Sequence, residues 1–108
     1  LPEEFTAIVS LNLMHIAPWS VALGLFRGAA RHISSDGVLV VYGPFKIEGK
    51  FTADSNARFD AALRNANSAW GVRDTAALQA AATHYGLTLD RIVEMPSNNV
   101  IVVFERSG

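Results

Sequence analysis

The chain has 108 residues, of which 50% are hydrophobic and 18% charged, and its 9 Lys and Arg residues nearly balance 10 Asp and Glu residues. This length fits one domain, and the apolar half of the composition excludes a disordered chain. A formal net charge of −1 argues against a protein that binds nucleic acid mainly by electrostatics. No apolar run reaches the ~20 residues of a membrane span, and no signal peptide is recognisable. Without cysteine, disulfide scaffolds and thiolate sites are excluded, and a cytoplasmic location is the default expectation.

The N-terminus is unusual for a complete protein. The chain begins with Leu1 rather than Met, and it enters an apolar stretch at residues 5–9. This abrupt start predicts a fragment of a longer protein, with a processed N-terminus as the alternative.

The first third of the sequence predicts a strand followed by a helix. The apolar run at residues 5–14 is nearly continuous, which is typical of a strand buried on both faces. Pro18 is suited to a first helical turn, and apolar residues then recur every three or four positions through 19–33. We expect Gly24 and Gly28 to permit close packing of this helix on a sheet. Residues 34–37 (SSDG) predict a turn after the helix.

The middle of the chain predicts one strand and two helices. Residues 38–42 form a β-branched apolar run bounded by glycines, which indicates a central parallel strand, and a polar loop follows at 46–52. A helix is expected at 55–66 with Ser55 or Asp54 as its N-cap. Residues 65–71 interrupt the pattern. A second helix, capped by Asp74 or Thr75, is expected to run through Tyr85, with Gly86 after its end.

The last part predicts two strands, at residues 87–95 and 100–104, joined by a tight connection at 96–99. Strands that alternate with helices indicate a parallel sheet with right-handed crossovers. The last connection is too short for a crossover, so the final strand must be antiparallel. The predicted fold class is α/β, a single domain with a mixed four-stranded sheet.

The handedness of the crossovers has a consequence for assembly. Both crossovers step in the same direction, so all three helices should cover one face of the sheet. The other face, built from alternate residues of apolar strands, would be bare, and the first strand would be an unprotected edge. We therefore expect the folded chain to self-associate through that face or edge, or another chain to supply the missing cover.

Several short motifs, taken together, resemble one family. They are residues 12–19 (NLMHIAPW), 42–45 (YGPF), 55–56 (SN), 59–60 (FD), 70–74 (WGVRD) and 93–99 (VEMPSNN). Their order and spacing resemble the family of class I S-adenosylmethionine-dependent methyltransferase-like proteins of unknown substrate that includes methyltransferase-like protein 26. The resemblance covers essentially all 108 residues. It implies the C-terminal half of a Rossmann-like fold with strand order 3-2-1-4-5-7-6, in which strand 7 alone is antiparallel.

The resemblance also implies a cofactor and a reaction. The full-length protein would use S-adenosylmethionine to methylate an unknown, small substrate. The glycine-rich loop and the acidic residue that hold this cofactor in the family belong to its N-terminal half, which these 108 residues do not include. We therefore expect no cofactor bound to this fragment alone. The alternatives are a non-catalytic interaction module that retains the fold, and part of another doubly wound enzyme such as a dehydrogenase.

His15 is the candidate catalytic residue. Ligands of open α/β sheets bind at the carboxyl ends of strands, and His15 follows the first strand. An imidazole titrates near ~6.5 and can act as a base if the methyl acceptor must lose a proton. The alternative is that His15 bonds to the backbone in the turn that leads into the helix. His32 and His84 are expected to be solvated near helix ends.

The other candidates surround the same strand ends. Asn12, Leu13 and Met14 are candidates for contact with the cofactor, with packing or a turn hydrogen bond as the alternative. Arg73 is suited to bind an anionic group of the substrate, or else to pair with Asp60 or Asp74 and order its loop. No metal-ligand spacing is recognisable. The candidate substrate-binding residues are Trp19, Tyr42, Pro44, Phe45, Asn56, Asp60, Trp70, Arg73, Asn98 and Asn99.

Overall fold

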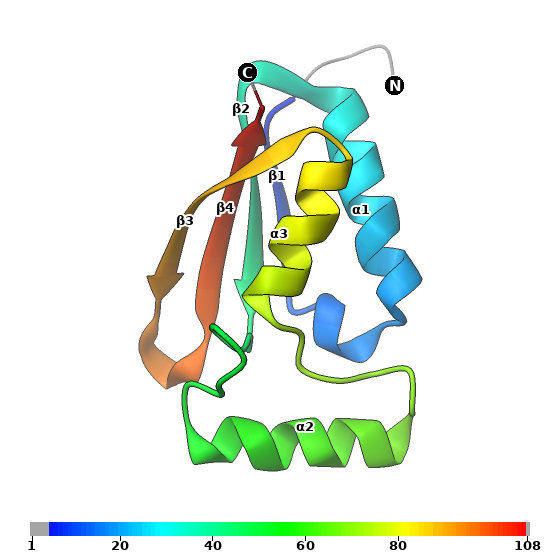
Figure 1. The fold of residues 1–108 in the computed structure, drawn as a ribbon, viewed down its shortest axis with the longest axis vertical. Helices are drawn as coiled ribbons and strands as arrows, with labels where there is room; N and C mark the ends of the chain where they lie inside the picture. Colours follow the sequence, from blue (N-terminus) through cyan, green and yellow to red (C-terminus); the bar gives the residue numbers. More distant parts are fainter. Residues whose placement is uncertain (1–4, 108) are drawn as a thin grey trace.

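A computed structural model describes residues 5–107 and shows a mixed α/β fold (Figure 1). The strands are β1 (Phe5–Leu11), β2 (Ile33–Gly43), β3 (Leu87–Glu94) and β4 (Val100–Arg106). The helices are α1 (Trp19–His32), α2 (Asp54–Ala66) and α3 (Thr75–His84), with short 3₁₀ turns η1 (Met14–Ile16) and η2 (Pro96–Asn98). The predicted order of strands and helices is confirmed.

The four strands form one sheet in the order β1-β2-β4-β3. β1 and β2 are parallel, and β4 is antiparallel to both β2 and β3. The predicted mixed sheet with an antiparallel last strand is therefore confirmed. β1, β2 and β3 run in the same direction, so their carboxyl ends lie at one end of the sheet (Figure 1).

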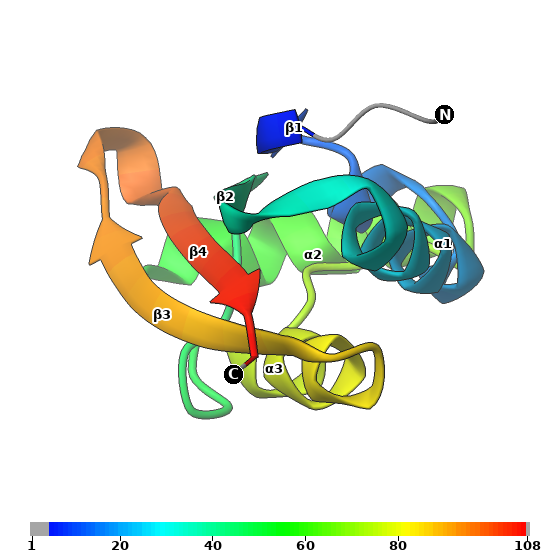
Figure 2. The same ribbon diagram turned by 90° about the horizontal axis from the view of Figure 1, so that it is seen from above.

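Helices α1 and α3 lie on the same face of the sheet and enclose the core between themselves and the strands (Figure 2). β2 alternates between buried and half-buried residues, with Leu39 and Val41 directed into this core. Phe26 of α1 meets Phe104 of β4 edge to face, with ring centroids 5.2 Å apart. Both rings are fully buried, so this contact joins the helix layer to the sheet.

The prediction that all three helices cover one face is wrong for α2. This helix lies across the end of the sheet at which β1, β2 and β3 terminate (Figure 1). Its buried residues are Asn56, Asp60 and Leu63, so only one of the three is apolar. α2 has too narrow an apolar stripe to join the helix layer, and its buried polar groups bond to loops instead.

Several predicted boundaries need correction. β1 ends at Leu11, and Met14 lies in η1 rather than in the strand. Residues 34–37 are not a turn but the beginning of β2, because Ile33 is fully buried and already pairs with β1. Neither Ser55 nor Asp54 caps α2, which starts at Asp54 after Ala53.

The predicted cap of α3 is confirmed. The Asp74 carboxylate accepts a hydrogen bond from the backbone N–H of Ala76 at 2.8 Å, which satisfies one free donor of the first turn. The helix ends at His84, one residue before the predicted end at Tyr85. Gly86 follows with φ +82°, in the left-handed region that favours glycine.

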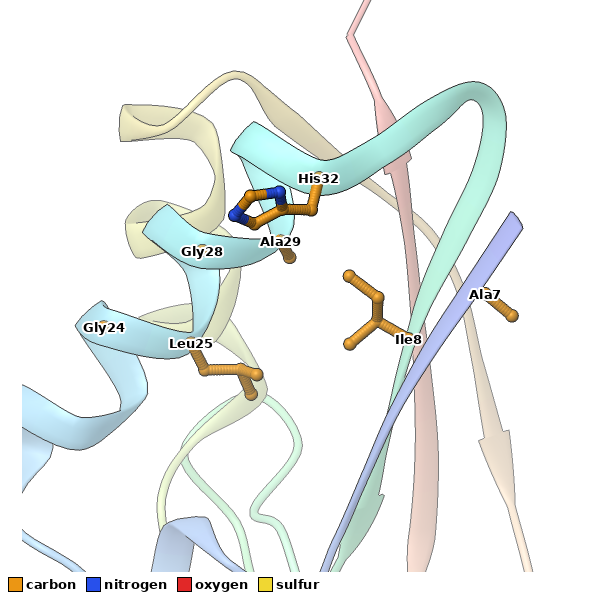
Figure 3. Close-up of a pocket in the computed structure, with 7 residues that line it drawn as sticks. All are labelled: Ala7, Ile8, Gly24, Leu25, Gly28, Ala29 and His32. Atoms are coloured by element: carbon orange, nitrogen blue, oxygen red, sulfur yellow. The ribbon is translucent and has the colours of Figure 1, made fainter. Parts of the chain in front are cut away.

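The expected close packing at Gly24 and Gly28 is wrong. A Cβ placed on either residue would meet nothing within 4 Å. Both glycines instead line an apolar hollow between α1 and β1, with His32 at one end (Figure 3). Nδ1 of His32 is buried there without a hydrogen-bond partner among residues 5–107.

Among residues 5–107, nothing covers the apolar sheet face opposite α1 and α3, as predicted. Its residues lie in register across the strands, so that Val9 pairs with Val40 and Val40 with Val103. At the β1 edge Val9 is 58% exposed and Leu11 64% exposed. We call the following set the uncovered face: Val9, Leu11, Val38, Val40, Tyr42, Val93, Ile101 and Val103.

The uncovered face predicts weak self-association. Each residue on a sheet face occupies about 4.8 Å by 6.6 Å, so the eight residues of the uncovered face span about 250 Å² of each copy. Two copies would bury about 500 Å², well below the ~1,200 Å² of stable complexes. We therefore expect monomers at low micromolar concentration and dimers only at high micromolar concentration, measured by analytical ultracentrifugation.

A matched pair of variants tests this contact. Val40→Lys places a charge in the middle of the uncovered face and should abolish the dimer. Val21→Lys, at an exposed position of α1, should leave the dimer unchanged. A monodisperse wild-type monomer at high micromolar concentration would show that the expectation is wrong.

Candidate functional site

The candidate site lies where β1 and β2 end, on the side of these strand ends that faces α2 (Figure 1). The chain leaves β1 through η1, which carries His15, and it leaves β2 at Gly43. The backbone N–H of Asn12 donates to the carbonyl of Tyr42 at 2.8 Å, so the two strand ends are held together. The structure thus brings residues from two distant segments to one end of the sheet.

The imidazole of His15 is mostly enclosed and has no hydrogen-bond partner among residues 5–107. His15 is 7% exposed, and its ring centroid lies 5.6 Å from that of Phe59 on α2. A Cβ at Gly43 would lie 3.7 Å from Nδ1 of His15, so the ring packs against the end of β2. No hydrogen bond joins a ring nitrogen of His15 to another residue in the described range. The backbone carbonyl of His15, in contrast, accepts from the N–H of Gly71 at 3.0 Å.

The protonation state of His15 follows from this enclosure. Burial lowers the pKa of His15 from its ordinary value of 6.5, because the charged imidazolium loses hydration. At pH 7 the imidazole is therefore neutral. A neutral imidazole with an unpartnered nitrogen can accept a proton from a bound molecule.

Two of the three candidate cofactor residues are accessible. Asn12 is exposed and has φ +53°, in the left-handed region that asparagine tolerates. Leu13 is 37% exposed beside it. Met14 is only 3% exposed, and its side chain belongs to the core. Asn12 and Leu13 are thus placed to contact a ligand at the end of β1.

Arg73 has a structural role in this part of the fold. Its Nε donates to the carbonyl of Met14 at 3.2 Å, and its Nη2 donates to those of Ala17 at 2.9 Å and Ala69 at 2.7 Å. Its guanidinium also lies over the ring of Trp19, 5.6 Å from the centroid. These contacts order the loop, as the alternative interpretation expected, but the partners are carbonyls rather than Asp60 or Asp74.

Asp60 and Asn56 hold α2 in place. The Asp60 carboxylate accepts from the N–H of Val72 at 2.8 Å and from Nε of Arg64 at 3.0 Å. Nδ2 of Asn56 donates to the carbonyl of Asn98 at 2.9 Å. Asn56 and Asp60 are 8% and 9% exposed, so both are buried polar groups with partners.

The remaining candidate substrate residues do not converge on His15 as one set. Pro44 and Phe45, which directly follow Gly43 in the chain, are buried. Tyr42 belongs to the uncovered face. Trp70 is half-buried in the loop after α2. Asn98 adopts a positive φ in the turn between β3 and β4, whereas Asn99 is extended.

Trp19 and Tyr85 line a second hollow, between α1 and α3.

Phe59 is a site residue that the sequence interpretation missed. Its spacing within 55–66 is typical of an apolar helix face, which predicts burial in the core. The structure leaves it 41% exposed against His15. The signal available in the sequence was its place in the 59–60 motif, next to a buried aspartate.

Residues 5–107 offer neither a metal-binding cluster nor a membrane-spanning helix. No group of three His, Asp or Glu side chains there is arranged to hold a metal ion. None of the described helices has the length and apolar character needed to cross a membrane.

Comparison with known proteins assigns the family. Residues 1–106 match the family described as "Protein of unknown function (DUF938)". The chain belongs to this family. The description of the family names no reaction, so the activity must be argued from the site.

Solved structures share the fold at low sequence identity. The chain is similar to the mitomycin 7-O-methyltransferase MmcR, with a TM-score of 0.83 and 18% identity over 99% of this chain and 31% of that one. It is similar to CalO1, a methyltransferase in calicheamicin biosynthesis in its SAH-bound form, with a TM-score of 0.80 and 22% identity over 94% and 30% of the two chains. It is also similar to LepI in complex with SAM, with a TM-score of 0.80 and 15% identity over 99% and 28%.

These neighbours establish the class I methyltransferase fold for the chain. The chain spans about a third of the length of each of them. The predicted fold class is confirmed.

The contacts of Arg73 predict a loss of stability. Arg73→Ala should lower the free energy of unfolding by about 2–4 kcal/mol, because three carbonyls lose a charged donor. Arg64→Ala is the matched control, since its partially exposed pair with Asp60 is expected to contribute about 1 kcal/mol or less. Urea denaturation measures both. Equal losses in the two variants would contradict the structural role of Arg73.

Proposed function

We propose that this chain is part of an S-adenosylmethionine-dependent methyltransferase in which His15 takes up the proton of the methyl acceptor. The observation that carries the proposal is the imidazole of His15, which is 7% exposed, has no hydrogen-bond partner in the described structure and lies at the carboxyl end of β1. The buried side-chain nitrogen without a partner among residues 5–107 belongs to His32 and not to His15, so the ring nitrogens of His15 keep access to water or to a ligand. The shared fold with proteins bound to SAH or SAM supports the choice of cofactor.

The residues present fit one side of such a cofactor. Asn12 and Leu13 are accessible at the end of β1, so they would lie against it. When bound, S-adenosylmethionine supplies an electrophilic methyl group on a positively charged sulfur. The cytoplasmic location and the small-molecule acceptor expected from the sequence belong to the same proposal, as does membership of the narrower family that includes methyltransferase-like protein 26.

In this proposal, the residues of this chain accept a proton and exclude water. With the cofactor bound, the neutral imidazole of His15 would accept the proton that the acceptor oxygen or nitrogen loses on methylation. Most of the rate enhancement in such a displacement comes from alignment and from exclusion of water. Gly43 and Phe59 enclose His15 and provide part of that exclusion.

The second candidate function is a non-catalytic module that retains the fold. The observation in its favour is that Arg73 and Asp60, two of the candidate substrate-binding residues, form hydrogen bonds within the protein and stabilise its loops. The same fold also carries a pericyclic reaction enzyme. Cofactor binding together with loss of turnover on removal of His15 would distinguish the methyltransferase from this module.

The placement of the cofactor residues predicts weak binding by residues 1–108 alone. Of the three candidate cofactor residues, only Asn12 and Leu13 are accessible in the described structure, so calorimetric titration with S-adenosylmethionine should show no saturable binding at micromolar concentrations. Saturable micromolar binding would show that the cofactor site is complete in this chain.

The role of His15 predicts separate effects on binding and turnover. In the full protein, His15→Ala should lower kcat by about 10²–10⁴-fold, the contribution typical of a positioned general base, and leave the Kd for S-adenosylmethionine within a few fold. Release of SAH from a panel of phenols and amines measures turnover, and calorimetry measures the Kd.

The wild-type pH profile provides the control. Since burial lowers the pKa of His15, the midpoint of the decline of kcat/KM on the acid side should lie below 6.5, the ordinary value for an imidazole. Equal loss of turnover and cofactor affinity, or a large fall in Tm, would instead assign His15 a structural role.

A further inference from the structure

Phe59 is an apolar side chain that does not enter the core. It lies on α2 and is 41% exposed, although it belongs to a helix whose neighbouring residues Asn56 and Asp60 are buried. Its ring approaches that of His15 at 5.6 Å with an interplanar angle of 57°. Phe59 therefore packs against His15 and not in the hydrophobic core.

α2 is fixed at two points on either side of Phe59. Three residues earlier, Asn56 donates to the carbonyl of Asn98 in the turn between β3 and β4. One residue later, Asp60 accepts from the N–H of Val72. Because both anchors are buried, the helix holds Phe59 over the strand ends rather than letting it move with the surface.

The enclosure of His15 is apolar on the sides that the structure describes. On α2 the nearby charged groups are Asp60 and Arg64, which bond to each other, and on the following segment Arg73 is directed to backbone carbonyls. At the end of β2 the titratable group is Tyr42, which belongs to the uncovered face. Burial alone accounts for the lowered pKa of His15, with no charged neighbour contributing.

We propose that Phe59 is a positioning residue that holds the imidazole of His15 against Gly43 and shields it from water. The inference rests on the proposed role of His15 as proton acceptor. Without the aromatic ring, the imidazole would gain solvent and rotational freedom. The protonated form would be better hydrated, and less of the base would be available near neutral pH.

The test is an NMR titration, in the full protein without cofactor or acceptor, that follows the three histidines of residues 1–108. His15→Gln identifies the signal of His15, and His32 and His84 serve as internal references. Phe59→Ala should shift the pKa of His15 upward toward 6.5, and Phe59→Leu should give a smaller upward shift because a leucine covers less of the ring. Phe51→Ala is the matched control, since Phe51 lies beneath Lys46 and should leave the pKa of His15 unchanged.

The possible outcomes separate the two proposals. An unchanged His15 pKa in the folded Phe59→Leu variant, or an equal shift in Phe51→Ala, overturns the role of Phe59. If Phe59→Ala does not fold, the Phe59→Leu shift alone decides. The titration needs no turnover, so it remains informative if the protein transfers no methyl group. Conversely, unchanged turnover in His15→Ala would overturn the proposed function whatever the titration shows.

Discussion

The edge-to-face contact between Phe26 and Phe104 is the interaction on which the rest of the structure depends. Phe26 lies on α1 and Phe104 on β4, and both are fully buried. This contact fixes α1 on the sheet. The short turn η1, which contains His15, comes directly before α1 in the chain and is therefore held in place by it. Aromatic pairs of this kind add about 0.5–1.5 kcal/mol to the burial of their area. The position of His15, the candidate base, thus depends on how the core packs.

Local sequence patterns were sufficient to predict most of the sheet. Residues 38–42 and 100–104 are continuous apolar runs, and a short connection before the last strand leaves only an antiparallel arrangement. The position of α2 could not be predicted in the same way. It depends on bonds from Asn56 to residue 98 and from Asp60 to residue 72, which join segments far apart in the sequence.

The sequence predicted where the candidate site lies, but not which of its polar residues are free to bind a ligand. The rule that ligands bind at the carboxyl ends of strands located His15 and Asn12 correctly in the fold. Polar character alone did not separate residues that are free to bind a ligand from residues that build the site. Arg73 is an example, because its three bonds go to carbonyls of residues 14, 17 and 69 that no spacing rule connects to it. The exposure of Phe59 likewise follows from the placement of α2 and not from its own helical period.

The central place of β4 has a consequence for the order of folding. β4 is the last strand in the chain, yet it lies between β2 and β3 and is antiparallel to both. During synthesis, β2 leaves the ribosome with only β1 available as a neighbour, and its other edge stays open until residues 100–106 emerge. Such an edge can pair with other nascent chains. The seven-residue strand β4 therefore fills the place between β2 and β3 and closes this edge of β2 to other nascent chains.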